Sequence, residues 1–255
     1  MLRYQSTLAP SVHIAFTSVA EGNLAFHVPD DRDAVLLRRR DLERGLGLGE
    51  QRFSYMDQIH STTVLEVQGP PEDSAVPTCD GLVSAGAARP LAVMVADCVP
   101  VVLVGTSAQG PVSAVAHAGR RGLLDGILTE TLQRMRAAGG EDFEAWIGPA
   151  ICGSCYEVPA DMAAEAEGLR PGIGTTTRRG TTGLDLPHAA AAELRDLGVA
   201  VTESGACTLE DENYFSYRRD PRTGRLAGLV WQADGHQHAG AVAGSLARPG
   251  TTPNR

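Results

Sequence analysis

The sequence predicts an α+β protein, a single domain of mixed β-sheets covered by helices. Valine-rich apolar runs with the length of buried strands alternate with segments in which apolar residues recur at helical spacing. Two strand-like runs near the end are separated by turn residues, as in an antiparallel hairpin. No internal stretch is rich enough in Pro, Gly or Ser to divide the chain. We therefore expect one folded domain over residues 1–232 and a flexible tail over 233–255, where Ala, Gly, His, Pro and Thr predominate.

The centre of the chain predicts two strands and a helix. The run Leu91–Val104 begins as a buried strand, but a polar pair and a proline interrupt it at 97–100. Val112–Ala118 predicts a second buried strand, which leads through a glycine into a helix over Arg120–Ala138. The junction between this strand and this helix is a place where α/β proteins tend to build their sites.

The second half of the chain predicts a further helix with recognisable ends. Asp185 is suited to cap the amino terminus of this helix, over Leu186–Leu197, and Gly198 is suited to follow its last turn. Apolar and turn residues predict the other elements: strands over Glu144–Ile147 and Val199–Thr202, a surface loop over Gly168–Gly183, and a hairpin over Phe215–Trp231 with its turn at 220–224.

Composition limits the class of function. The 255 residues are 43% hydrophobic and 21% charged with a formal net charge of −9, which fits a globular protein and argues against nucleic acid as a partner. All 22 basic residues are arginine, so a lysine Schiff base and a lysine-dependent P-loop are excluded. Neither a signal-peptide pattern nor a run of 18 apolar residues occurs, so we expect a cytoplasmic protein that does not bind membranes.

Three residues stand out for their chemistry. Cys98 follows Asp97 inside an apolar run, where a cysteine alone would be a small buried hydrophobe but an ionised aspartate needs a partner. His117 ends a buried strand, and His60 precedes another apolar run. Two imidazoles and a thiolate form a ligand set for Zn²⁺ that leaves a fourth position open. The pair of Cys98 and His117 could equally act without metal, as nucleophile and base.

Arg120 and Arg121 follow His117 within one turn of the predicted helix. Cations at the start of a helix oppose its dipole, which predicts an anion there, held by the guanidiniums and the helix terminus. The alternative is that both side chains lie in solvent or pair with Asp125.

The remaining cysteines carry a weaker signal. Cys152 and Cys155 form a C-x-x-C pair, which can be redox-active or half of a zinc site. The chain has no second such pair, and Cys79 and Cys207 are distant in the sequence. We therefore expect two free thiols in a turn.

A set of motifs resembles one protein family over about residues 15–231. The chain resembles the YfiH family, also called the polyphenol-oxidoreductase laccase or purine nucleoside phosphorylase family. The segments that carry the resemblance are QIHSTTV at 58–64, DGLVS at 80–84, ADCVPVVL at 96–103, AVAHAGRRG at 114–122, IGPAICGSCYEV at 147–158 and FSYRRDPRTGRLAGLVW at 215–231.

The resemblance implies a fold similar to that of a group of cysteine hydrolases, and a zinc site. The family's ligand positions match His60, Cys98 and His117. The activities attributed to the family are phosphorolysis of adenosine, inosine and methylthioadenosine, and deamination of adenosine. Copper-dependent oxidation of phenols and an amidase role in peptidoglycan editing have also been proposed for it.

The chain departs from the family pattern around the expected pocket. The family tryptophan is Arg120, the glycine after the first histidine is Ser61, and the asparagine of an Asn-Arg pair is Arg38. Residues that do match the family's substrate positions are Asn23 and Arg39. These changes leave the ligand set intact and affect the part of the site that selects the substrate.

The sequence and the resemblance together predict a zinc-dependent enzyme acting on purine nucleosides and phosphate. Zinc would lower the pKa of a water molecule to about 7, Asp97 could transfer protons, and Arg121 would bind phosphate. The first alternative is an amidase with Cys98 as nucleophile and His117 as base, in which His60 would be dispensable. A binding protein with structural zinc is another. Copper-dependent phenol oxidation is less favoured, because three such ligands fit one metal ion and not a multi-copper cluster.

Overall fold

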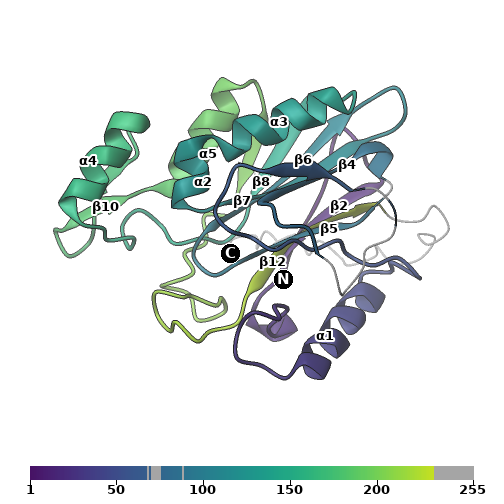
Figure 1. The fold of residues 1–255 in the computed structure, drawn as a ribbon, viewed down its shortest axis with the longest axis horizontal. Coiled ribbons are helices and arrows are strands. Elements are labelled where there is room, and N and C mark those ends of the chain that lie inside the picture. Colours follow the sequence, from purple (N-terminus) through teal and green to yellow (C-terminus); the bar gives the residue numbers. More distant parts are fainter. Residues whose placement is uncertain (68, 70–75, 88, 233–255) are drawn as a thin grey trace, which may run out of the picture.

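Two β-sheets packed face to face form the centre of the molecule in this computed structural model, which describes residues 1–67, 69, 76–87 and 89–232 (Figure 1). The predicted tail, residues 233–255, lies outside the described residues. The first sheet is antiparallel throughout, in the order β1 (Leu2–Gln5), β2 (Val12–Phe16), β12 (Leu226–Gln232) and β5 (Leu91–Val95).

The second sheet has six strands and is mixed. Its order is β11 (Ala200–Glu203), β8 (Glu141–Ile147), β6 (Val99–Thr106), β7 (Val112–Ala118), β4 (Gly81–Ser84) and β3 (Val64–Glu66). The pairs at its two edges, β11 with β8 and β3 with β4, are parallel, and the inner pairs are antiparallel.

Helices cover the outer faces of both sheets (Figure 1). Figure 1 shows α2 (Arg120–Asp125), α3 (Ile127–Ala137) and α5 (Leu186–Asp196) along the six-stranded sheet, with α1 (Arg32–Gly45) beyond the four-stranded sheet. The helix α4 (Ala160–Leu169) packs beside a two-stranded sheet of β9 (Gly174–Thr176) and β10 (Thr182–Leu184), and two short 3₁₀ helices span Val19–Glu21 and Ala85–Ala87. This arrangement confirms the α+β class and the mixed sheets.

The layers explain why the central strands are apolar without alternation. Val101 and Leu103 of β6 pack against the helices, while Val102 and Val104 pack between the two sheets. A strand with both faces covered reads as a continuous apolar run. Burying each such side chain fully contributes about 1.5–3 kcal/mol. Leu42 of α1 belongs to the same buried cluster as Leu229 and Trp231 of β12.

Several predicted elements form as expected. The strand Val112–Ala118 is β7, and α5 begins after Asp185, whose carboxylate accepts a hydrogen bond from the backbone N–H of His188 at 3.1 Å. Gly198 follows α5 with a φ of 83°, the left-handed conformation expected after a helix. The apolar run Leu91–Val104 divides into β5 and β6, which belong to different sheets. The polar residues that interrupt the run lie where the chain crosses from one sheet to the other.

Three expectations were wrong. The helix expected over Arg120–Ala138 is two helices, because Gly126 adopts a φ of 98° between them. The loop expected over Gly168–Gly183 contains the hairpin of β9 and β10. The hairpin expected over Phe215–Trp231 does not form, since only β12 is a strand there and it pairs with β2 and β5.

Arginine side chains explain the lost hairpin. The guanidinium of Arg219 donates to the backbone carbonyls of Thr208 and Leu209, at 3.0 and 3.1 Å. Residues 216–222 therefore form turns held by contacts to another loop, which local sequence patterns do not reveal. Across the described residues, no helix is both long enough and apolar enough to cross a bilayer.

Candidate active site

The three predicted ligands meet at one end of the six-stranded sheet. Strands β6 and β7 are antiparallel, with Pro100 opposite His117, so the start of β6 lies beside the end of β7. Cys98 immediately precedes β6, and His117 lies at the end of β7. His60 lies in the loop before β3, four residues from its first residue. The fold thus brings together residues that are 19 to 57 positions apart in the chain.

The donor atoms of His60, Cys98 and His117 all lie within 4.8 Å of one another. The Sγ of Cys98 lies 3.6 Å from Nε2 of His60, and the two imidazole rings are 4.6 Å apart between centroids at an interplanar angle of 75°. His117 is buried, Cys98 is half-buried and His60 is exposed. The group therefore has one side that faces solvent, which a ligand or substrate can approach.

Asp80 orients both histidines. Its Oδ1 accepts hydrogen bonds from Nδ1 of His117 at 2.8 Å and from the backbone N–H of His60 at 2.9 Å. Its Oδ2 accepts from the N–H of Ile59 and from both the N–H and the hydroxyl of Ser61. Asp80 is fully buried directly before β4. One carboxylate therefore positions the His60 loop and fixes the ring of His117.

Electrostatics keep this carboxylate ionised. Burial raises the pKa of Asp80, but hydrogen bonds from His117 and Ser61 lower it more, to about 2. Burial lowers the pKa of His117, and the neighbouring Cys98 and Asp80 raise it above its usual value. Burial likewise raises the pKa of Cys98, while the charge and hydrogen bond of His117 bring it below the usual value. The site thus favours a thiolate at Cys98.

The donor set fits one transition-metal ion. Because Nδ1 of His117 is occupied by Asp80, its Nε2 is the nitrogen available as a ligand, and such a carboxylate–histidine pair is common behind metal ligands. Two imidazole nitrogens and a thiolate suit Zn²⁺ or copper. Three protein ligands leave a coordination position for water or substrate.

The donor atoms converge only because the backbone at His60 and Gly119 allows them to approach closely. His60 has a φ of 62°, a left-handed conformation that costs a non-glycine residue on the order of 1–3 kcal/mol and that the bonds to Asp80 maintain. A side chain at Gly119 would place its Cβ 2.4 Å from Cδ2 of His60 and 3.3 Å from Sγ of Cys98. The glycine that begins α2 is therefore required for the donors to converge.

A cavity of about 270 Å³ opens beside His60 and Cys98. Three arginines line it, Arg120, Arg121 and Arg218. Two tyrosines, Tyr156 and Tyr217, also line it. Its remaining lining residues are Ala96, Asp97, Ile151 and Leu186. The cavity therefore combines candidate metal ligands, positive charge and aromatic surface, the groups that an anionic or phosphorylated substrate requires.

Asp97 lies in this wall in a left-handed conformation, with a φ of 84°, at the crossing between the two sheets. Its Oδ1 accepts a hydrogen bond from the hydroxyl of Thr208 at 2.6 Å, and its Oδ2 accepts from the N–H of Arg218 at 2.7 Å. The carboxylate therefore fastens two distant loops to the cavity. Each of its oxygens retains capacity for a further hydrogen bond.

The two predicted substrate-binding residues lie away from this cavity. The amide of Asn23 donates to the carbonyl of Ala25 and the carboxylate of Asp30, both at 2.9 Å, and accepts from the N–H of Arg225. Arg39 is buried, with its guanidinium over the ring of Tyr55 at 3.6 Å. Neither residue lines the cavity with the donors. A binding role for Asn23 and Arg39 stays a prediction.

Sequence reasoning did not single out several residues of the site. Asp80 was identified only as part of a motif, although an acidic residue directly before an apolar strand is itself a signal of a buried, paired charge. Thr208 and Arg218 reach the site through contacts 111 and 121 residues apart in the chain, for which no local pattern exists.

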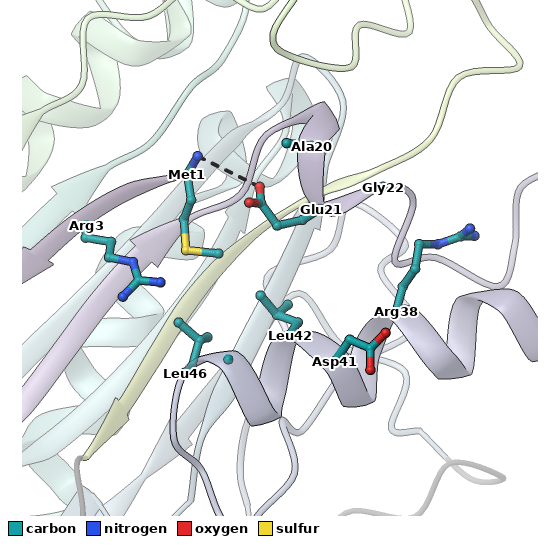
Figure 2. A pocket seen from close by; sticks show the side chains of 10 residues that line it. Met1, Arg3, Ala20, Glu21, Gly22, Arg38, Asp41, Leu42 and Leu46 are labelled. Atoms are coloured by element: carbon teal, nitrogen blue, oxygen red, sulfur yellow. Dashed lines mark ion pairs between the residues drawn. The ribbon is translucent and has the colours of Figure 1, made fainter. Parts of the chain in front are cut away.

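A larger cavity, of about 420 Å³, lies between α1 and the residues after β2 (Figure 2). Figure 2 shows the amino group of Met1 directed at Glu21, 3.8 Å away, with Arg3 and Asp41 on either side. None of its lining residues belongs to a group of metal ligands found among the described residues. The smaller cavity is therefore the candidate active site.

Comparison with known proteins agrees with the motifs. The chain is 43% identical over 212 residues to a protein of Mycobacterium tuberculosis named purine nucleoside phosphorylase, covering 82% of this chain and 84% of that protein. A protein of the same name from Corynebacterium glutamicum is 44% identical over 216 residues, covering 83% and 87% of the two chains.

Solved structures show the same fold. A Neisseria meningitidis protein superposes with a TM-score of 0.75 at 30% identity, covering 91% of this chain and 99% of that one. YlmD from Geobacillus stearothermophilus superposes with a TM-score of 0.75 at 28% identity, covering 90% and 94%. YfiH from Bacillus licheniformis gives 0.74 at 25% identity, covering 87% and 92%.

The family model described as multi-copper polyphenol oxidoreductase laccase matches residues 13–233, which include the whole six-stranded sheet, all of the four-stranded sheet except β1 and the first residue of β2, and every residue of the candidate active site. Together with the relatives above 40% identity, this match identifies the family. The chain belongs to the multi-copper polyphenol oxidoreductase laccase family, the family of YfiH.

Proposed function

We propose that this protein is a zinc-dependent purine nucleoside phosphorylase that cleaves adenosine, inosine and methylthioadenosine and also deaminates adenosine. One observation carries the proposal: two of the three grouped donors, His60 and Cys98, line a cavity that arginines also line, in a chain 43–44% identical to proteins named purine nucleoside phosphorylase. Predicted partners are therefore purine nucleosides and inorganic phosphate. The cytoplasmic location predicted from the sequence stays a prediction.

Arginines supply the phosphate site in this proposal. Phosphorolysis joins a phosphate oxygen to C1′ of the ribose as the bond from C1′ to the base breaks. Arg121 and Arg120 line the cavity on the side of α2, and Arg218 lines it from the loop that holds Asp97. Guanidiniums bind phosphate through two parallel hydrogen bonds, which would hold the nucleophile in line with C1′. Since α2 has only six residues, the proposal rests on these side chains and not on a helix dipole.

Aromatic side chains are proposed to hold the base. Tyr156 and Tyr217 line the cavity, and the guanidinium of Arg218 lies 5.2 Å from the centre of the Tyr156 ring. A purine has a flat π face that stacks favourably on such a ring. We place the base against these tyrosines and the ribose towards Cys98.

Zinc at the three donors would supply Lewis-acid activation of a water molecule for deamination. The chain's own residues keep the site ready for this role. Asp80 holds Nδ1 of His117 so that Nε2 faces the site, and the thiolate of Cys98 supplies negative charge to the ligand set. Asp97 is proposed to accept and return the proton through a free lone pair of its carboxylate.

Product analysis tests the proposal. Purified protein loaded with Zn²⁺ or Cu²⁺ is incubated with each nucleoside, with and without phosphate, and the products are separated by chromatography. We expect free base only with phosphate, together with ribose 1-phosphate from adenosine or inosine and 5-methylthioribose 1-phosphate from methylthioadenosine, and we expect inosine from adenosine without phosphate. Cys98→Ala should abolish both reactions, whereas Arg134→Ala, at an exposed position of α3, should preserve them. Activity in Cys98→Ala would contradict the proposal.

A second candidate function is supported by the contacts of His117. Cys98, His117 and Asp80 are arranged as nucleophile, base and orienting carboxylate, the order found in cysteine hydrolases. Such an enzyme would cleave an amide, as in peptidoglycan editing, without metal. His60 separates the two functions: His60→Ala would keep an amidase active, and it would inactivate an enzyme that needs the metal.

A further inference from the structure

A second group of metal-ligating side chains lies outside the site described above. It contains Cys152, Cys155, Cys207 and Glu210, whose donor atoms all lie within 4.8 Å of one another. Cys152 and Cys155 lie in a turn after β8, and neither forms a disulfide. The tertiary structure adds Cys207 and Glu210, from the loop after β11, which sequence spacing had left apart.

Backbone contacts fix the two loops against each other. Ala150 and Cys207 form a parallel bridge, with the N–H of Thr208 donating to the carbonyl of Ala150 at 3.0 Å. Within the first loop, the N–H groups of Cys155 and Tyr156 both donate to the carbonyl of Cys152, at 2.9 and 3.0 Å. This tight turn is the conformation that lets both thiols of a C-x-x-C pair approach one ion.

Hydrogen bonds show where the donor atoms converge. The N–H of Cys152 donates to Sγ of Cys207 at 3.4 Å. The thiol of Cys155 donates to Oε1 of Glu210 at 2.9 Å. A divalent cation would take the place of the proton shared by this pair, and it would be bound by both partners.

We infer that Cys152, Cys155, Cys207 and Glu210 form a second zinc site, closed and structural. Thiolate and carboxylate are ligands that Zn²⁺ accepts, and four protein ligands complete its tetrahedral coordination. With Zn–S bonds of about 2.3 Å, tetrahedral geometry puts neighbouring sulfurs about 3.8 Å apart. The observed separations need a contraction of no more than about 1 Å, which side-chain rotation supplies.

The charges around the four proposed ligands also support a zinc site. Three thiolates and a carboxylate leave excess negative charge around a divalent ion. Arg178 offsets part of it, because its Nη1 lies 2.5 Å from Oε1 of Glu210 and its backbone N–H donates to the carbonyl of Ser154 at 3.0 Å. The arginine is therefore held beside the ligands by the same turn that carries the cysteine pair.

The proposed zinc site lies next to one wall of the active-site cavity. The turn that begins at Cys152 is flanked by Ile151 and Tyr156, which line the active-site cavity. The loop of Cys207 carries Thr208, whose hydroxyl holds Asp97 at 2.6 Å. A metal ion joining these loops would fix one wall of the cavity without contacting the substrate. The inference does not depend on the reaction that the cavity performs.

Metal content of the full-length protein tests this inference. Protein purified in the presence of Zn²⁺ is analysed by mass spectrometry of its metals. We expect two zinc ions per chain in the wild type, and one in Cys98→Ala, which disrupts only the active-site group. Cys152→Ser with Cys155→Ser should also retain one. As a control, Cys79→Ser should retain two, because Cys79 is buried beside Met56 and belongs to neither group of ligands.

Cobalt substitution identifies the ligands. Co²⁺ bound by thiolates absorbs in the near ultraviolet with an intensity that rises with the number of sulfur ligands. Cys98→Ala loaded with Co²⁺ should keep most of this band, and the double serine variant should lose most of it. If the double variant does not fold, Glu210→Gln should release zinc to a chelator at least tenfold faster than the wild type.

Three results would overturn the inference. One is a single zinc ion in the wild type and none in Cys98→Ala. Another is a Co²⁺-loaded Cys98→Ala protein without the thiolate band. The third is an intact mass two hydrogens below the reduced value in freshly purified protein, with no zinc at these residues, which would identify a disulfide pair.

Discussion

The carboxylate of Asp80 and the imidazole of His117 share a buried hydrogen bond of 2.8 Å, and the same oxygen of Asp80 accepts the backbone N–H of His60. Two candidate ligands from separate segments are therefore oriented by one atom. Because the carboxylate is fully buried and ionised, its bonds are the strong, charge-assisted kind. This relationship links the integrity of the His60 loop to the tautomer of His117.

Asp80→Asn should weaken zinc binding at the active site. An amide cannot accept all the hydrogen bonds that the carboxylate receives, and its NH₂ group would face donors. Loss of such a supporting carboxylate typically lowers metal affinity about 10–100-fold. Competition with a chromogenic chelator measures the change. Asp41→Asn, at an exposed position of α1, is the control and should leave zinc affinity unchanged.

Gly119→Ala should damage the same site by steric contact. The backbone of Gly119 has a φ of −69°, which alanine adopts freely, so the fold should persist. The new Cβ would lie 2.4 Å from Cδ2 of His60 and would displace the imidazole. A displacement of about 1 Å can cost roughly 100-fold in rate, and we expect a loss of that order in kcat/KM.

The matched control for Gly119→Ala is Gly168→Ala. Gly168 lies in α4 with open space where its Cβ would be, so the substitution should leave activity intact and should raise stability slightly. Equal activity of the two variants would disprove the steric argument at Gly119.

Arg121→Ala should raise the apparent KM for phosphate in phosphorolysis. A hydrogen bond to a charged group contributes about 1.5–3 kcal/mol, so the increase should be roughly 10–100-fold. Deamination of adenosine consumes water and should fall much less. Arg134→Ala serves as the charge-matched control on the exposed face of α3. If both reactions fall equally while zinc stays bound, Arg121 holds the nucleoside or the pocket and not phosphate.

Glu144→Gln should make stability less dependent on pH. The carboxylate of Glu144 accepts hydrogen bonds from the hydroxyl of Ser6 at 2.8 Å and from the N–H of Thr7 at 3.0 Å. Burial raises the pKa of Glu144, but the hydrogen bonds from Thr7 and Ser6 lower it more, so its folded-state pKa lies below the usual value. The carboxylate therefore stabilises the fold above the unfolded pKa of about 4.3.

The stabilisation of the fold by Glu144 changes with pH in one direction only. The contribution of Glu144 is complete near neutral pH and is lost as the pH falls through its lowered folded-state pKa. Denaturant unfolding should show Glu144→Gln less stable than wild type by about 1.5–3 kcal/mol at neutral pH, with the difference shrinking in acid. Glu141→Gln, at the exposed start of the same strand, should show no such difference. A difference that grows in acid would contradict the assignment.

Local patterns in the sequence determine much of the fold. The strand Val112–Ala118 is apolar at five of its seven buried positions, and Asp185 and Gly198 bound the helix α5 through backbone conformations that need only their neighbours. Predictions failed where distant contacts outweigh local preference. Arg219 binds carbonyls of another loop and prevents a hairpin, and Gly126 takes a left-handed conformation that divides a helix of continuous periodicity.

For the site, residue types by themselves determined the chemistry available, and tertiary structure decided which groups meet. His60, Cys98 and His117 could be selected from the sequence because imidazole and thiolate are metal ligands and because their motifs resemble one family. Asp80 could not be given its role, since that role consists of hydrogen bonds to three loop residues and one strand. Tertiary structure likewise brings Cys152 and Cys155 close to Cys207 and Glu210. Strands β8 and β11 are paired in parallel, so the chain segments that follow them lie at the same end of the sheet.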